Sequence, residues 1–85
     1  MITLNLTEAQ AFLVAYALNH GAHDDSNSAH QMRRDEEHAA MLADARNART
    51  QWLLACSLFA QLAMPGEASE MLEHIRVLNT SFEIE

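Results

Sequence analysis

Lysine is absent from this chain of 85 residues, and five arginines face twelve acidic residues, which gives a net charge of −7. Nonspecific binding to nucleic acid depends on clustered positive charge. The sequence therefore predicts no direct contact with nucleic acid. A strongly acidic small protein is instead expected to prefer basic partners.

Cysteine occurs once, at Cys56, so no disulfide can form within the chain. Cys56 lies in an apolar run, and buried thiols are usually inert, so we expect a small core residue rather than a nucleophile. The use of cysteine favours an intracellular setting. No signal peptide and no apolar run of about 20 residues are visible, which predicts a cytoplasmic protein that does not span a membrane.

Glycine and proline are scarce, at two residues and one residue respectively. Gly21 and Gly66 are too far apart for a glycine-rich phosphate loop, and no serine has the surroundings of a nucleophile elbow. We therefore expect no enzymatic activity and no cofactor. Neither glycine nor proline occurs in residues 29–63, which predicts one long helix or two helices with a break near residues 34 and 35.

The first helix is predicted from a capping box formed by Thr7 and Gln10, and Gly21 is a plausible left-handed stop. Residues 20–28 are mostly turn formers and predict a loop. Ser28 with its neighbours up to Gln31 offers a second capping box.

A helical seam is predicted in the second half of residues 29–63, because apolar side chains recur there at spacings of three and four. Residues 52–64 carry few polar groups, so we expect this half to be deeply buried. The seam consists of Met41, Ala45, Ala48, Trp52, Ala55, Phe59 and Leu62.

The last helix is predicted at residues 67–78, after a stop at Pro65. Its apolar stripe consists of Ala68, Met71, Leu72, Ile75 and Leu78. Residues 1–6 and 81–85 alternate between apolar and polar side chains and predict two short strands that pair. The fold class is thus mainly α: a single domain over residues 1–85, built as a three-helix or helical-hairpin bundle with a minor two-stranded sheet of the N- and C-terminal strands.

A homodimer is predicted from residues 11–18, which are apolar on every side of the expected helix. One stripe would suffice to cover a small core, so a second surface must be covered as well. Open strand edges point the same way. We expect Phe12 and Tyr16 at the dimer interface.

Four of the five histidines, at positions 20, 23, 30 and 38, gather in one polar stretch. Histidine and carboxylate ligands suit zinc, but no known metal signature has this spacing. We predict a solvated loop without a metal. A metal site with His20, His23, His30 and His38 as ligands, or a pH-responsive surface, remains the alternative.

Arg46 and Arg49 have no acidic neighbour three or four residues away on a helix. Either they pair across the fold with Glu67, Glu70 or Glu73, or they bind an anion or a partner, as arginine often does at interfaces. The acidic run at residues 35–37 is the second candidate surface. The expected partner-binding residues are Asp35, Glu36, Glu37, Arg46 and Arg49.

The opening residues 2–9, followed by a helix, a polar loop and a long helix, resemble small accessory proteins of phages and prophages. The resemblance implies a non-enzymatic protein that binds and inhibits a host protein or a defence system, as anti-CRISPR proteins do, and that acts in the host cytoplasm. Three other functions stay open: a structural module that self-associates, a protein that binds a small ligand or metal, and an antitoxin.

Overall fold

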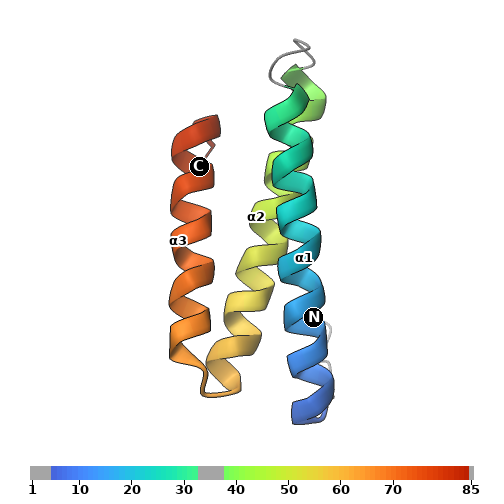
Figure 1. The fold of residues 1–85 in the computed structure, drawn as a ribbon, viewed down its shortest axis with the longest axis vertical. Helices are drawn as coiled ribbons and strands as arrows, with labels where there is room; N and C mark the ends of the chain where they lie inside the picture. The colour runs from blue at the N-terminus through green and yellow to red at the C-terminus, as the bar shows by residue number, and fades with distance from the viewer. Residues whose placement is uncertain (1–4, 33–37, 85) are drawn as a thin grey trace.

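The computed structural model describes residues 5–32 and 38–84, and these form three helices. They are α1 (Glu8–Met32), α2 (His38–Gln61) and α3 (Pro65–Phe82). Neighbouring helices run antiparallel (Figure 1). The mainly α class is therefore confirmed. No strand occurs in the described part of the chain, so the predicted two-stranded sheet is wrong there, and residues 1–4 and 85 lie outside it.

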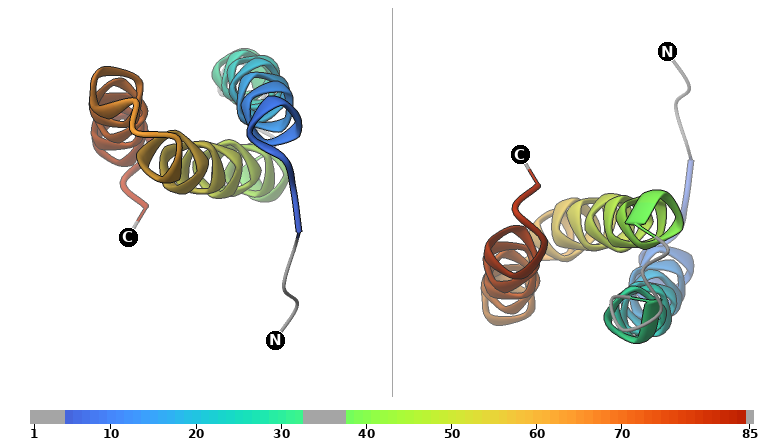
Figure 2. Two further views of the ribbon diagram at one scale, coloured as in Figure 1. Left: turned by 90° about the horizontal axis from the view of Figure 1, so that it is seen from below. Right: turned by 90° about the horizontal axis from the view of Figure 1, so that it is seen from above.

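The second helix holds the centre of the fold. End-on views show an open angle with α2 at the vertex and α1 and α3 as its two arms (Figure 2). Both arms pack along α2. The central helix is thus α2. One side of α1 is exposed, and the sequence predicted that α1 has apolar residues on more sides than contact with the core requires.

The first helix begins at the predicted capping box. Thr7 N–H donates to Gln10 Oε1 at 3.0 Å, and Gln10 N–H donates to Thr7 Oγ1 at 3.1 Å. However, α1 does not stop at Gly21 but continues to Met32, so the predicted loop over residues 20–28 is wrong.

Polar residues in the second half of α1 have partners across the interface with α2, which explains why a stretch of turn formers is helical. Ser28 Oγ donates to Asp44 Oδ2 at 2.8 Å, so Ser28 lies inside α1 and is not the N-cap that its sequence neighbours suggested. Gln51 Nε2 donates to Asp25 Oδ2 at 2.6 Å. These tertiary bonds outweigh a low intrinsic helix propensity.

Small side chains bring α1 and α2 close together. Ala15, Ala22 and Ala29, at intervals of seven residues, are fully buried on α1. A seven-residue repeat keeps one face of a helix against its partner. The facing helix contributes its own fully buried alanines, Ala45, Ala48 and Ala55.

The predicted seam of α2 is confirmed, since its members from Met41 to Phe59 are buried and Leu62 is partly buried. Trp52 is 3% exposed, and its indole N–H donates to Asn19 Oδ1 at 2.9 Å. Deep burial of the whole stretch 52–64 is wrong, however, because Leu53 and Leu54 are about half exposed on the outer side of α2.

The turn between α2 and α3 is a Schellman motif. Met64 N–H donates to the carbonyl of Phe59, and Ala63 N–H donates to that of Ala60. Ala63 has a φ of 58°, the left-handed conformation that this motif requires. Pro65 is the first residue of α3, where its missing N–H is not needed. The break that the sequence allowed near residues 34 and 35 lies outside the described residues, and α1 and α2 are separate helices on either side of it.

The third helix is longer than predicted and includes Ser81 and Phe82, which were assigned to a strand. Glu83 then adopts a left-handed φ of 52°, and Ile84 is buried at 8% exposure. The predicted stripe holds for Met71, Ile75 and Leu78, whereas Leu72 is more than half exposed.

Candidate functional site

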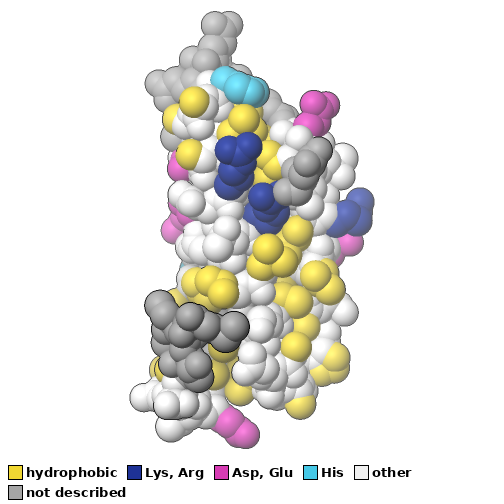
Figure 3. Space-filling view, turned by 180° about the vertical axis from the view of Figure 1, so that it is seen from behind, with side chains coloured by type: hydrophobic (Ala, Val, Ile, Leu, Met, Phe, Trp, Pro, Cys, Tyr) yellow, Lys and Arg dark blue, Asp and Glu magenta, His cyan; other side chains and the backbone are white. Residues whose placement is uncertain are grey.

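A groove with basic side chains lies on the back of the molecule, between α2 and the end of α3. It has a volume of about 500 Å³. Arginine side chains gather there below a histidine, beside apolar side chains (Figure 3). We call it the cationic groove, and its lining residues are His38, Leu42, Arg46, Arg49, Phe82, Glu83 and Ile84.

One face of α2 supplies the basic wall of the cationic groove. His38, Leu42, Arg46 and Arg49 follow one another at spacings of four, four and three residues, which places them along one side of a helix. The opposite wall comes from the C-terminal end of α3. The sequence predicted Arg46 and Arg49 as binding residues, but it did not predict this wall, which depends on how α3 ends.

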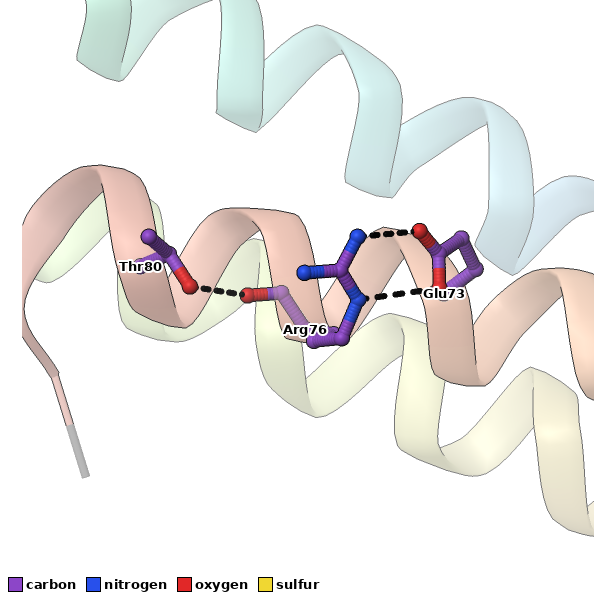
Figure 4. Close-up of polar contacts among 3 residues, drawn as sticks. All are labelled: Glu73, Arg76 and Thr80. Atoms are coloured by element: carbon purple, nitrogen blue, oxygen red, sulfur yellow. Dashed lines mark hydrogen bonds and ion pairs between the residues drawn. The ribbon is translucent and has the colours of Figure 1, made fainter.

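Two acids of α3, Glu70 and Glu73, have charged neighbours within their own helix. Arg76 donates to both carboxylate oxygens of Glu73, and Thr80 Oγ1 donates to the carbonyl of Arg76 at 3.0 Å (Figure 4). The hydrogen bond from Arg76 lowers the pKa of the Glu73 carboxyl. Glu70 lies 3.7 Å from His74 Nε2. Glu70 and Glu73 thus have neighbours on their own helix, and the expected pairing of Arg46 and Arg49 with Glu67, Glu70 or Glu73 stays a prediction.

The four clustered histidines separate in the structure. His20 is exposed on α1, and His38 lines the cationic groove. His23 and His30 line a smaller groove of about 220 Å³ between α1 and α3. Among the described residues, no group of three or more histidine, cysteine or acidic side chains is arranged to hold a metal ion.

Three aromatic rings pack together in the groove between α1 and α3, and the sequence analysis missed one of them, His74. His74 stacks on Trp52 with ring centroids 5.0 Å apart and planes 21° apart. His23 meets both rings edge-on, at 5.2 Å from Trp52 and 4.8 Å from His74. His74 lies outside the apolar stripe predicted for the last helix, and only the packing of three helices brings it to His23.

Comparison of the chain with protein families, curated proteins and solved structures gives no match. Within the described residues, no helix combines the length and the hydropathy that crossing a membrane requires.

The predicted dimer residues lie near the free end of α1. Phe12 is 40% exposed and Tyr16 36% exposed, and their rings lie 4.7 Å apart. Tyr16 also meets the buried ring of Phe59 edge-on at 5.2 Å. Phe12 is therefore the more accessible of the two, while Tyr16 is anchored to the core. The acidic candidates Asp35, Glu36 and Glu37 lie outside the described residues.

The cationic groove has the chemistry to bind a carboxylate beside an apolar group. A guanidinium presents a planar fork of N–H donors that matches a carboxylate. Arg46 is exposed, Arg49 is partly buried, and Leu42, Phe82 and Ile84 supply apolar surface next to them. Cys56 plays no part in this groove, since its thiol is partly buried and donates to the carbonyl of Ala68 on α3.

Proposed function

We propose that this chain is a non-enzymatic protein-binding protein whose contact site is the cationic groove. The observation that carries the proposal is the pairing of Arg46 and Arg49 with the apolar wall of Phe82 and Ile84. Arginine next to buried apolar surface is the composition typical of interface hot spots.

The partner is a protein that places an acidic side chain and an apolar side chain in the groove. Complementary charge over the whole surface mainly sets the rate of encounter. Because the chain carries a net charge of −7, the partner's wider surface is basic, and the acidic contact is local. Arg46 and Arg49 then select the orientation in which the partner docks.

The class of function we propose is inhibition of a host protein or a host defence system by a phage or mobile-element protein. A small, acidic helical domain supports this class, because such a domain acts by occupying a surface rather than by turning over a substrate. The acidic run Asp35, Glu36 and Glu37 is proposed as a second contact of the same kind, directed at basic groups on the partner.

Self-association through Phe12 and Tyr16 is part of the proposal. The support for it is the exposure of adjacent apolar side chains on α1, where Leu13 is 68% and Val14 38% exposed. Contiguous exposed apolar surface is typical of an interaction site. A homodimer would present two cationic grooves to its target.

The test is affinity capture from a bacterial lysate with the wild type and with the double variant Arg46→Glu, Arg49→Glu, followed by mass spectrometry. A captured protein that the double variant loses supports the proposal. The matched control is Arg76→Glu, which reverses an exposed arginine outside the groove and should retain capture.

Two other outcomes would replace the proposal. If the wild type retains a small ligand or a metal but no protein, the chain is a small-ligand binder. If it captures only itself, it is a structural module. A captured partner encoded as a toxin would identify an antitoxin instead of an inhibitor of the host.

A further inference from the structure

Two titratable rings hold α1 and α3 together across their groove. His23 comes from α1 and His74 from α3, and their ring centroids are 4.8 Å apart. Both rings contact Trp52, which α2 places at the floor between them. α1 and α3 are the two arms of an open angle (Figure 2), and they also meet where the ring of His30 contacts that of Phe82.

The two imidazoles have different surroundings, since His23 is exposed on α1 and His74 is partly buried on α3. His74 Nε2 is buried without a hydrogen-bond partner among the described residues, and the Glu70 carboxylate stays beyond hydrogen-bond range at 3.7 Å. Val77 and Leu78 line the groove next to the rings. Two positive charges on rings 4.8 Å apart repel each other, and the Glu70 carboxylate, 3.7 Å from His74 Nε2, offsets part of that repulsion.

We propose that His23, Trp52 and His74 form an acid-sensitive latch: when both imidazoles take up a proton, α1 and α3 separate and the Trp52 face becomes exposed. Above neutral pH the rings are uncharged and stack, which keeps the groove closed. In acid two cations face each other across the floor of the groove, and their repulsion replaces the stacking contact.

Some groups around His23 lower its pKa and others raise it. Burial is the largest influence and lowers the pKa of His23, and His74 and His20 lower it further. Glu70 of α3 and Asp24 of α1 oppose them. On the side of α2, the group that faces His23 is the uncharged indole of Trp52. The net direction is a pKa below the ordinary value of 6.5, so the closed state resists protonation.

The lowered pKa of His23 makes the closed state depend on pH. A histidine whose pKa is lowered in the closed state binds protons more weakly there than in the open state. The closed state is therefore favoured fully above pH 6.5, and this preference is lost as the pH falls through the lowered pKa of His23. The latch opens on acidification and closes again on neutralisation.

Trp52 is the sole tryptophan and reports the latch directly. We would record its fluorescence and its quenching by acrylamide from about pH 8 to about pH 5, the range over which histidine changes charge. Far-UV circular dichroism is measured on the same samples. The expected result is a reversible shift of emission to longer wavelength and stronger quenching, with no loss of helix.

The variants His23→Phe and His74→Phe keep a ring in the stack but remove the charge, so each should abolish the acid-induced shift. His30→Phe is the matched control. His30 also lies on α1 and meets a ring of α3, but that ring is Phe82, which does not titrate, so the shift should persist. If a phenylalanine variant lacks helical dichroism at about pH 8, the glutamine variant at the same position replaces it.

Three results would overturn the latch. One is unchanged emission and quenching across the titration in the wild type. Another is a loss of helix in step with the shift, which would indicate global unfolding. The third is a shift that survives both His23→Phe and His74→Phe, or that His30→Phe also removes.

Discussion

Gly21 of α1 lies directly against Gln51 of α2: a Cβ atom at position 21 would overlap the Gln51 side-chain oxygen. Gln51 in turn donates to Asp25 at 2.6 Å. Glycine inside a helix costs about 1 kcal/mol relative to alanine. The close approach of α1 and α2 therefore explains why the helix passes through a residue that the sequence suggested as its end.

This contact predicts that the effect of Gly21→Ala on stability depends on whether Gln51 is present. Alone, the substitution gains helix propensity, about 1 kcal/mol, but displaces Gln51 from Asp25, which costs a similar amount, about 1 kcal/mol. The free energy of unfolding in urea should hardly change. In the Gln51→Ala background the same substitution should raise it by about 1 kcal/mol. Equal effects in the two backgrounds would contradict the contact.

Ala63→Gly should stabilise the protein. Ala63 holds a left-handed φ of 58° at the end of α2, and a residue with a Cβ atom pays roughly 1–2 kcal/mol for that conformation. Glycine removes most of this strain. The matched control is Ala60→Gly, one turn earlier in the helix, which should lose about 1 kcal/mol. Thermal melts of both variants check the prediction, and a loss of stability in both would refute it.

Trp52→Ala should cost about 3–5 kcal/mol, a large part of the stability of a small domain. Trp52 is 3% exposed and joins all three helices through Asn19, His23 and His74. Its neighbour Leu53 is half exposed, so Leu53→Ala should cost only about 1 kcal/mol. Urea unfolding of the two variants measures the loss in free energy of unfolding for each. Similar losses for both would show that the seam is misplaced.

Phe12→Asp should dissociate the proposed homodimer, because a charge at a buried interface is costly. Light scattering of the wild type at micromolar concentration should give at least twice the chain mass of 9.5 kDa. Leu54 is 53% exposed on the outer side of α2 and does not belong to the apolar surface of α1, so Leu54→Asp serves as the control. A monomeric wild type, or equal dissociation by both variants, would rule out this interface.

The sequence predicted α2 well and the second half of α1 poorly, for a physical reason. The seam of α2 contains large apolar side chains at regular spacing. Because burial of such side chains is the main driving force for folding, their spacing was enough to predict the helix face that is buried. The continuation of α1 rests on Asn19, Asp25 and Ser28, whose preference for turns is overcome by partners on α2. The seven-residue spacing of Ala15, Ala22 and Ala29 was the signal that could have revealed it.

The end of the chain shows why a short alternating pattern is ambiguous. Phe82 and Ile84 are both buried, as a strand would require. Yet Phe82 belongs to the last turn of α3, and Ile84 is buried only because Glu83 turns the chain. The basic side of the cationic groove could be read from the spacing of Arg46 and Arg49, whereas its apolar wall depends on this turn.

The most direct test of the proposed function locates the partner on the surface by photo-crosslinking. A photoreactive phenylalanine analogue replaces Leu42, which lines the cationic groove, or Leu54, which is exposed on the same helix outside it. In a bacterial lysate, we expect an adduct to one protein from position 42, none from position 54, and loss of the adduct when Arg46 and Arg49 are changed to Glu. An adduct from position 54 alone, or one that survives the arginine changes, would contradict it.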